Sequence, residues 1–254
     1  MGLKKIKNMQ YTHDLDPNKS SWINFELIQG LENPQFNTRK QSELALRSLL
    51  KALDLRDNYT YGHSIRVAHY CLILGSHLLL NPNDLYELEL SGLFHDIGKI
   101  GIPDHILCKP TGLSSTEFSI MKQHPVMSYE ILKNFKNFES ISINTKHHHE
   151  RFDGKGYPEG LQGEAIPLFS RIILIADTFD AITSSRVYRV GKSQEIAFQE
   201  LLEFSGSQFD PTLVRHFISG MREFTADLSE NTSLKANTLK PEENNVIILE
   251  KKSA

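Results

Sequence analysis

Apolar residues recur every three or four positions over most of the chain, which is the spacing of an amphipathic helix. The first such stripe follows Arg39 and consists of Leu46, Leu49, Leu50 and Leu53. A second stripe predicts a helix over about 60–80 that buries Val67, Cys71, Leu74 and Leu78. Helical patterns do not alternate with strand patterns, and no repeat of fixed period is visible. The sequence therefore predicts an all-α domain.

Capping residues mark where further helices begin. Asn81-Pro82 supplies an N-cap followed by proline at the first helical position, and Gly98 punctuates the end of that helix. Ser114 and Glu117 have the spacing of a capping box. Additional helices are expected from Pro125, in the stretch leading into 147–150, over about 169–179, near 193–204 and after Asp210-Pro211.

Polar, aperiodic segments flank this helical region. Residues 1–38 are interpreted as an N-terminal arm or linker, and 39–225 as one domain. Residues 226–254 are interpreted as a C-terminal tail with one β-prone run at 246–249. Two segments rich in glycine and proline, 98–113 and 154–163, are expected to be long loops inside the domain.

Composition narrows the class of protein. With 28 basic and 31 acidic residues among 254, the formal charge of −3 gives no reason to expect binding to polymeric nucleic acid. Two cysteines cannot form a disulfide framework, which favours a reducing compartment. Apolar runs are far shorter than the 18 or so residues of a membrane span. We therefore expect a cytoplasmic protein without a membrane anchor.

Histidine is the unusual component, because eleven residues are about twice the number that average usage would give. Five of them lie where helices begin or end: His63, His95, His124, His148 and His149. His95 is followed directly by Asp96. A lone His-Asp pair is more often a helix-terminal histidine held by its neighbour than a pair of metal ligands, but four further histidines in similar places favour a metal site.

A carboxylate in an apolar helix strengthens this interpretation. Asp177 lies in the run FSRIILIAD, where burying a charge is costly unless a cation compensates it. Asp180 lies three residues further, on a neighbouring face of the helix. Five imidazoles with Asp96 and Asp177 are too many ligands for one tetrahedral ion, and the mixed nitrogen and oxygen set suits Fe, Mn, Zn or Ni. Two metal ions sharing a bridging carboxylate would use all seven.

The other histidines are assigned ordinary roles, as surface or satisfied core residues. These are His13, His69, His77, His105 and His216. His147 adjoins the 148–149 pair, but consecutive helical residues diverge by about 100°. It is expected to support a ligand or to face solvent.

At this point the sequence resembles the HD-GYP domain, a branch of the HD superfamily of metal-dependent phosphohydrolases. The matching stretches are DNYTYGHSIRVA, LFHDIGKIGIPDHILCKP, His124-Pro125, HHERFDGKGYP, RIILIADTFDAITSSRVYR and GSQFDP, which together span about 57–211. The resemblance implies a helical bundle with a glycine-rich GYP loop, and hydrolysis of cyclic di-GMP, a bacterial second messenger in signal transduction.

Position by position, the resemblance makes the same seven residues the metal ligands: His63, His95, Asp96, His124, His148, His149 and Asp177. It implies that Lys99, Arg186 and Arg189 contact substrate phosphate and guanine. On spacing alone, Lys99 could equally be a lysine favoured by the helix C-terminus, and the arginines could be surface charges.

The GYP signature consists of Gly156, Tyr157 and Pro158, in a loop that directly follows two of the expected ligands. Glycines permit a tight turn beside a ligand, and Tyr157 is a candidate substrate contact. A solvated loop of ordinary glycine-rich sequence is the alternative. Glu150 and Asp153 are candidates for orienting ligand histidines through hydrogen bonds.

One departure from the family bears on the number of metals. Some members carry an acidic residue four positions before the first ligand histidine and hold a third ion. Here Tyr59 occupies that position, and Asp57 lies two residues too early. We therefore expect two divalent transition-metal ions per chain, with Fe or Mn favoured over Zn or Ni.

The expected reaction is attack of a metal-bridging hydroxide on phosphorus, in line with the leaving 3′ oxygen. Asp96 would bridge the two ions, and Lys99 would stabilise developing charge. The product would be pGpG, with GMP after a second cut.

Two rival functions remain open. One is an HD phosphohydrolase acting on another cyclic dinucleotide, such as 3′,3′-cGAMP. The other is a catalytically silent sensor or adaptor, from which ligands should have been lost. Candidate partners, besides the substrate, are a diguanylate cyclase, a regulatory protein and a second copy of the chain.

Overall fold

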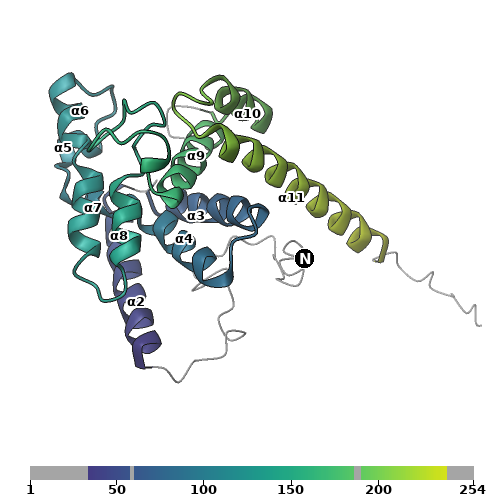
Figure 1. The fold of residues 1–254 in the computed structure, drawn as a ribbon, viewed down its shortest axis with the longest axis horizontal. Coiled ribbons are helices and arrows are strands. Elements are labelled where there is room, and N and C mark those ends of the chain that lie inside the picture. The colour runs from purple at the N-terminus through teal and green to yellow at the C-terminus, as the bar shows by residue number, and fades with distance from the viewer. Residues whose placement is uncertain (1–33, 58–59, 186–189, 239–254) are drawn as a thin grey trace, which may run out of the picture.

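The computed structural model describes residues 34–57, 60–185 and 190–238. Over these ranges the fold is helical and no strand forms, apart from an isolated bridge between Ser205 and Phe209 (Figure 1). The longer helices are α2 (Pro34–Asp54), α3 (Thr60–His77), α4 (Pro82–Phe94), α7 (His124–Leu132), α8 (Glu139–Lys146), α9 (Leu168–Thr183), α10 (Gln194–Glu203) and α11 (Pro211–Thr238). Short elements are η2 (Ile97–Gly101), α5 (Asp104–Leu107), α6 (Ser115–Met121) and η3 (Gly163–Ala165). The predicted all-α class is confirmed.

Helix α3 is the central element, because its side chains enter two separate apolar cores. Val67, Cys71 and Leu74 pack with residues of α9, α10 and α11 in one core. Ile65 and Ala68 pack with α2, α4, α7 and α8 in the other. In Figure 1, α3 and α4 lie between the α2–α7–α8 side of the molecule and the α9–α11 side. A residue near the start of α3 is thereby fixed relative to both halves.

Helix starts follow the capping residues read from the sequence. The side chain of Asn81 accepts hydrogen bonds from two backbone amides of α4, and Pro82 is the first helical residue. Ser114 and Glu117 form the expected reciprocal capping box at α6. Asp210 accepts from the amides of Thr212 and Leu213 at the start of α11. These caps satisfy amides that have no partner inside their helices.

Some details differ from the sequence prediction. Leu49 is 38% exposed, because the buried face of α2 follows Leu46, Leu50 and Leu53 and leaves Leu49 at its edge. Helix α2 begins at Pro34 rather than at residue 39, and α11 runs on to Thr238, past the expected end at 225. The β-prone run at 246–249 lies outside the described residues. The domain limits stay predictions.

None of the described helices combines the length and the apolarity needed to cross a bilayer.

Candidate metal centre

The seven expected ligands come from five different parts of the bundle, and the structure brings them together. His63 is the fourth residue of α3, and Asp177 lies on α9. His95 caps the end of α4, and Asp96 follows it before η2. His124 is the first residue of α7, while the remaining pair, His148 and His149, follows α8 directly.

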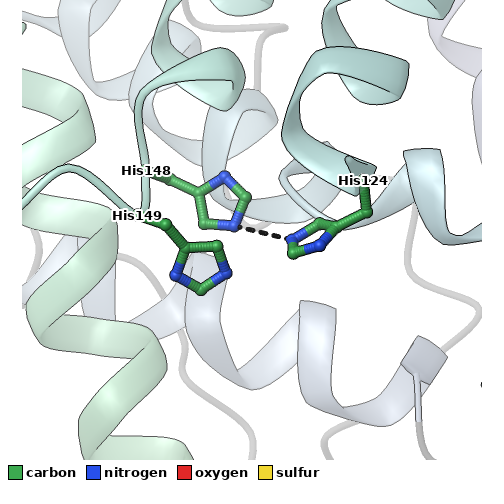
Figure 2. A group of neighbouring side chains, drawn as sticks. All are labelled: His124, His148 and His149. Carbon is green, nitrogen blue, oxygen red and sulfur yellow. Dashed lines mark hydrogen bonds between the residues drawn. The ribbon is translucent and has the colours of Figure 1, made fainter. Parts of the chain in front are cut away.

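Three overlapping sets of these residues have ligand atoms that all lie within 4.8 Å of one another. Two of the sets share no residue, and we call them the two ligand groups; the third set, His95, Asp96 and His148, takes one histidine from each of them. One group contains His63, His95 and Asp177, and the other contains His124, His148 and His149. Figure 2 shows the second group, with His124 facing His148 and His149 across the gap between α7 and the end of α8. Each group therefore offers three ligand atoms at one point.

The carboxylate of Asp96 lies between the two groups. Its Oδ1 is 3.1 Å from Nε2 of His124, in the second group. Its Oδ2 is 3.2 Å from Nε2 of His95 and 3.7 Å from Nε2 of His63, in the first group. One carboxylate therefore presents a separate oxygen to each group, which is the geometry that a bridging ligand requires.

Hydrogen bonds fix the tautomers of three of these imidazoles. Nδ1 of His95, His124 and His148 lies 2.7, 2.8 and 2.6 Å, respectively, from a backbone carbonyl three residues earlier. A carbonyl only accepts, so Nδ1 must carry the proton and Nε2 is left as a lone pair directed at the centre. The same arrangement orients metal-binding histidines in general.

The fourth imidazole, that of His63, is held by a carboxylate instead. Its Nδ1 lies 2.8 Å from Oδ2 of Asp180. Arg66 donates to the same carboxylate through Nε at 2.6 Å and Nη2 at 3.0 Å. Sequence reasoning noted Asp180 but assigned it no role, because the partnership joins residues 117 positions apart.

Burial and neighbouring charges shift the pKa values of the histidines in the centre. Burial, with the nearby imidazole of His124 as a smaller cause, lowers the pKa of His149 to about 3, and the pKa of His148 also falls well below its usual range. Both rings are therefore neutral, the form that binds metal. Burial alone would lower the pKa of His63, but the carboxylates of Asp177 and Asp180 outweigh it and raise the pKa to about 9.

The two carboxylates of the centre are held in their charged form. Burial opposes ionisation, but His95, Lys99 and His124 together hold the pKa of Asp96 well below its usual range. His63 does the same for Asp177. The buried carboxylate of Asp96 and the partly buried carboxylate of Asp177, beside the neutral imidazoles of His148 and His149, form a site that a cation would stabilise.

Two observations test whether metal ions fit here. Nε2 of His95 is buried without any hydrogen-bond partner. Nε2 of His124 and Nε2 of His148 face each other at 3.3 Å, as the dashed line in Figure 2 marks, although both rings are anchored with the proton on Nδ1. Two opposed lone pairs need a proton or a metal ion between them. The donor set therefore fits divalent transition metals.

Lys99 lies at the edge of the centre. Its Nζ is 2.7 Å from Oδ2 of Asp96, three residues earlier in the chain. Burial alone would lower its pKa, but the Asp96 carboxylate raises it above the usual value. The ammonium is therefore protonated and donates to the carboxylate that lies between the two groups.

The GYP loop closes over the second group. The ring of Tyr157 stacks on that of His149, with centroids 4.9 Å apart. The ammonium of Lys122 lies 5.3 Å from the centroid of the Tyr157 ring. A Cβ at Gly156 would lie 2.3 Å from the amide nitrogen of Arg151, so only glycine allows the loop to approach the backbone that follows His149. Lys122 was not singled out from the sequence.

The orienting roles expected for Glu150 and Asp153 are wrong. Glu150 is buried and accepts hydrogen bonds from the amides of Glu159, Gly160 and Leu161, so it shapes the GYP loop. Asp153 forms an ion pair with Arg151, with Oδ2 2.8 Å from Nη2. Carbonyls three residues earlier already hold three of the ligand rings, which leaves them no need of a carboxylate.

Three of the histidines assigned ordinary roles, His69, His77 and His216, make contacts outside the ligand groups, whereas His13 lies outside the described residues. His69 packs against Phe224, and burial lowers its pKa to about 4. His77 and His216 contact each other through Nδ1 at 3.1 Å. His147 is buried beside two acceptors, since its Nδ1 lies 2.9 Å from the carbonyl oxygen of Ile143 and its Nε2 lies 3.3 Å from the Glu159 carboxylate. Arg186, Arg189 and Tyr59 lie outside the described residues.

A helical fold that gathers five imidazoles and two carboxylates at neighbouring points offers a site that could hold metal ions. The family model of the HD domain matches residues 47–213. The chain therefore belongs to the HD domain family, as the resemblance implied. Phosphohydrolases of this family depend on metals, and the His/Asp groups described above are where this chain could hold them.

Named relatives fall into two groups by substrate. A cyclic di-GMP phosphodiesterase of Vibrio cholerae is 36% identical over 240 residues, covering 89% of this chain and 49% of that protein. The 3′3′-cGAMP-specific phosphodiesterase 1 of the same organism is 42% identical over 141 residues, covering 56% of this chain and 33% of that protein. The chain thus spans half or less of the length of these curated relatives.

Among solved structures, a cyclic GMP-AMP-specific phosphodiesterase of V. cholerae aligns with a TM-score of 0.57 and 25% identity. The alignment covers 78% of this chain and 53% of that one. The fold of the HD bundle is therefore shared over most of the described helices.

Proposed function

We propose that this chain is a metal-dependent phosphodiesterase that hydrolyses cyclic di-GMP to pGpG, with GMP as the product of a second cut. The observation that carries the proposal is the pair of ligand groups with the Asp96 carboxylate between them. Two ions held in this way are a recurring arrangement for cleaving phosphate esters. Relatives named as cyclic di-GMP phosphodiesterases support the choice of substrate.

The ligand groups suggest how two ions would be divided. His63, His95 and Asp177 would hold one, His124, His148 and His149 the other, and Asp96 would bridge them. Fe or Mn is the favoured metal, with Zn or Ni as alternatives. When bound, such ions supply a water-derived nucleophile near neutral pH and neutralise phosphoryl charge.

Side chains around the centre would bind and position the substrate. The Lys99 ammonium would donate to a phosphoryl oxygen as negative charge develops on it. Tyr157, already stacked on His149, offers an aromatic face beside the centre for a guanine base. Arg186 and Arg189 stay predicted contacts to phosphate and guanine.

A second substrate has a specific observation in its favour. The cGAMP-specific relative is 42% identical over its aligned segment, against 36% for the cyclic di-GMP phosphodiesterase over a longer one. Both substrates present the same 3′–5′ phosphodiester to the centre and differ in one base. Cyclic di-GMP is the substrate we propose, and 3′,3′-cGAMP is the alternative.

Incubating anaerobically metal-loaded protein with each cyclic dinucleotide tests this function. We expect cyclic di-GMP to be converted to pGpG, measured by chromatography, with a higher kcat/KM than 3′,3′-cGAMP. The opposite ratio would assign the chain to the cGAMP group. Absence of turnover with Fe, Mn, Zn and Ni, despite bound metal, would instead indicate a sensor or adaptor. A variant with His124 replaced by alanine is the control for contaminating phosphodiesterase.

The number of ions is a separate expectation, namely two per chain. Asp57, the nearest acid before His63, accepts a hydrogen bond from Oγ1 of Thr60 at 2.7 Å, and position 59 holds a phenol that is neutral at pH 7. A third cation would have to overcome repulsion from the other two without a further anionic ligand. Metal quantification together with anomalous scattering from crystals measures the number, and a third fully occupied peak beside Tyr59 would refute it.

The cellular setting is part of the same proposal. A cytoplasmic protein that removes a second messenger would act in signal transduction, without binding polymeric nucleic acid. A diguanylate cyclase, a regulatory protein and a second copy of the chain are the proposed partners. Co-purification and light scattering at defined concentrations test them.

A further inference from the structure

Asp180 is a fully buried carboxylate that no part of the proposed reaction uses. It lies one turn beyond Asp177 on α9 and makes no direct contribution to either ligand group. Instead its carboxylate accepts hydrogen bonds from three side chains. These donors are Nδ1 of His63 at 2.8 Å, Nε and Nη2 of Arg66, and the hydroxyl of Ser184 at 2.9 Å from Oδ1. A buried anion with this set of donors is held in one orientation.

His63 differs from three of the other ligand imidazoles in the kind of group that accepts its Nδ1 hydrogen bond. His95, His124 and His148 donate from Nδ1 to neutral backbone carbonyls, which no side-chain substitution can remove. His63 donates from Nδ1 to a carboxylate. A negatively charged acceptor makes the opposite nitrogen a stronger electron donor than a carbonyl does, and it also fixes the tautomer.

We propose that Asp180 is the positioning residue of one metal site only: it holds His63 with Nε2 facing Oδ1 of Asp177 at 3.2 Å, where the ion shared with His95 and Asp177 would lie. The charge of Asp180 would therefore set the affinity of that ion and not of the other. The proposal rests on the two-ion centre described under the proposed function, but not on the identity of the substrate. His63 belongs to the first ligand group, and the second group has no member in contact with Asp180 among the described residues.

The chemistry of an amide explains why Asp180→Asn is the informative change. A carboxylate only accepts hydrogen bonds, so every group around Asp180 must point a proton at it. An amide of the same shape presents one acceptor and two donor hydrogens. Facing Arg66, it can direct its NH2 group at His63, which then moves its own proton to Nε2. An imidazole protonated at Nε2 cannot bind a metal there.

The test is a metal titration of the full chain, followed by counting bound ions at a fixed free concentration of Mn²⁺. We expect the wild type to hold two ions and Asp180→Asn to hold one, with affinity for the lost ion reduced by about 10- to 100-fold. Raising free Mn²⁺ by the same factor should restore the second ion. In crystals of the variant, the remaining anomalous peak should lie among His124, His148 and His149.

Two further variants separate positioning from packing. Arg66→Gln breaks the same ion pair but leaves the carboxylate facing His63, so it should keep both ions. Asp210→Asn removes a nearly buried carboxylate that pairs with Arg171 at 2.6 Å, away from both ligand groups, and it should also keep both. Equal metal loss in Asp180→Asn and Arg66→Gln would overturn the proposal, as would retention of both ions by Asp180→Asn at wild-type affinity.

A measurement on the wild type covers the case in which Asp180→Asn does not fold. Nitrogen NMR of the metal-loaded chain, labelled at its imidazoles, should show His63 protonated at Nδ1, and a bare Nδ1 would overturn the proposal. Because the titration counts ions rather than turnover, a failed phosphodiesterase assay leaves this test intact. Conversely, an Asp180→Asn variant with both ions at full affinity would refute the positioning role and leave the phosphodiesterase proposal standing.

Discussion

Asp96→Ala is expected to abolish phosphodiesterase activity and to lower the metal content of both ligand groups. The carboxylate lies within 3.2 Å of an imidazole from each of them, with a different oxygen toward each. Water cannot replace a bridging anion, because it carries no charge to hold two cations close together. A loss of several kcal/mol of transition-state stabilisation corresponds to a rate reduced by about a thousandfold or more.

The measurement pairs turnover of cyclic di-GMP with metal quantification on the same preparation. His95→Ala should behave similarly, although it belongs to a single ligand group. Asp104→Ala is the matched control, since Asp104 forms an exposed ion pair with Arg56 and contacts no ligand. An Asp96→Ala protein that kept two ions and its activity would show that the carboxylate does not bridge them.

That these seven residues would lie together could be predicted from the sequence because several of them stand beside a strong local signal. Asp177 interrupts an apolar helix, His95 lies where a helix ends, and His148 and His149 precede a glycine-rich loop. Such signals depend on a few neighbouring residues, so they can be recognised in the sequence without any knowledge of tertiary contacts. Two ions bridged by Asp96 were already expected from the sequence and its resemblance, but which imidazoles lie together in each group required the fold.

What the sequence missed are contacts between distant segments. Asp180 meets His63 only because α3 packs against α9, and no local pattern distinguishes it from a surface acid at the same spacing. Glu150 was assigned to a ligand histidine because it adjoins His149 in sequence, yet its side chain turns toward the amides of the GYP loop. Residues that are adjacent in the sequence have neighbouring backbones, but their side chains can point in different directions.

Lys99→Ala is expected to separate metal binding from catalysis, because it should keep both ions and lose rate. Lys99 lies 2.7 Å from Asp96, and that carboxylate raises its pKa, so the side chain is an ammonium with no lone pair to offer a metal. Removing one donor aimed at developing negative charge typically lowers kcat by about 10²- to 10³-fold. The effect should appear in kcat more than in KM, because the charge it stabilises grows as the bond breaks.

The alternative for Lys99 is a purely electrostatic partner of Asp96, and metal affinity distinguishes the two roles. If the ammonium only balanced the carboxylate, Lys99→Ala would leave Asp96 more negative, bind the ions more tightly and spare kcat. Lys109→Ala is the matched control, since Lys109 forms a comparable ion pair with Glu117 at 2.6 Å between α5 and α6 and is expected to change neither quantity. Steady-state kinetics with metal counts on the same samples decide the matter. Loss of metal from the Lys99→Ala protein would contradict its assignment to substrate, because a protonated amine removed from beside two cations should, if anything, favour their binding.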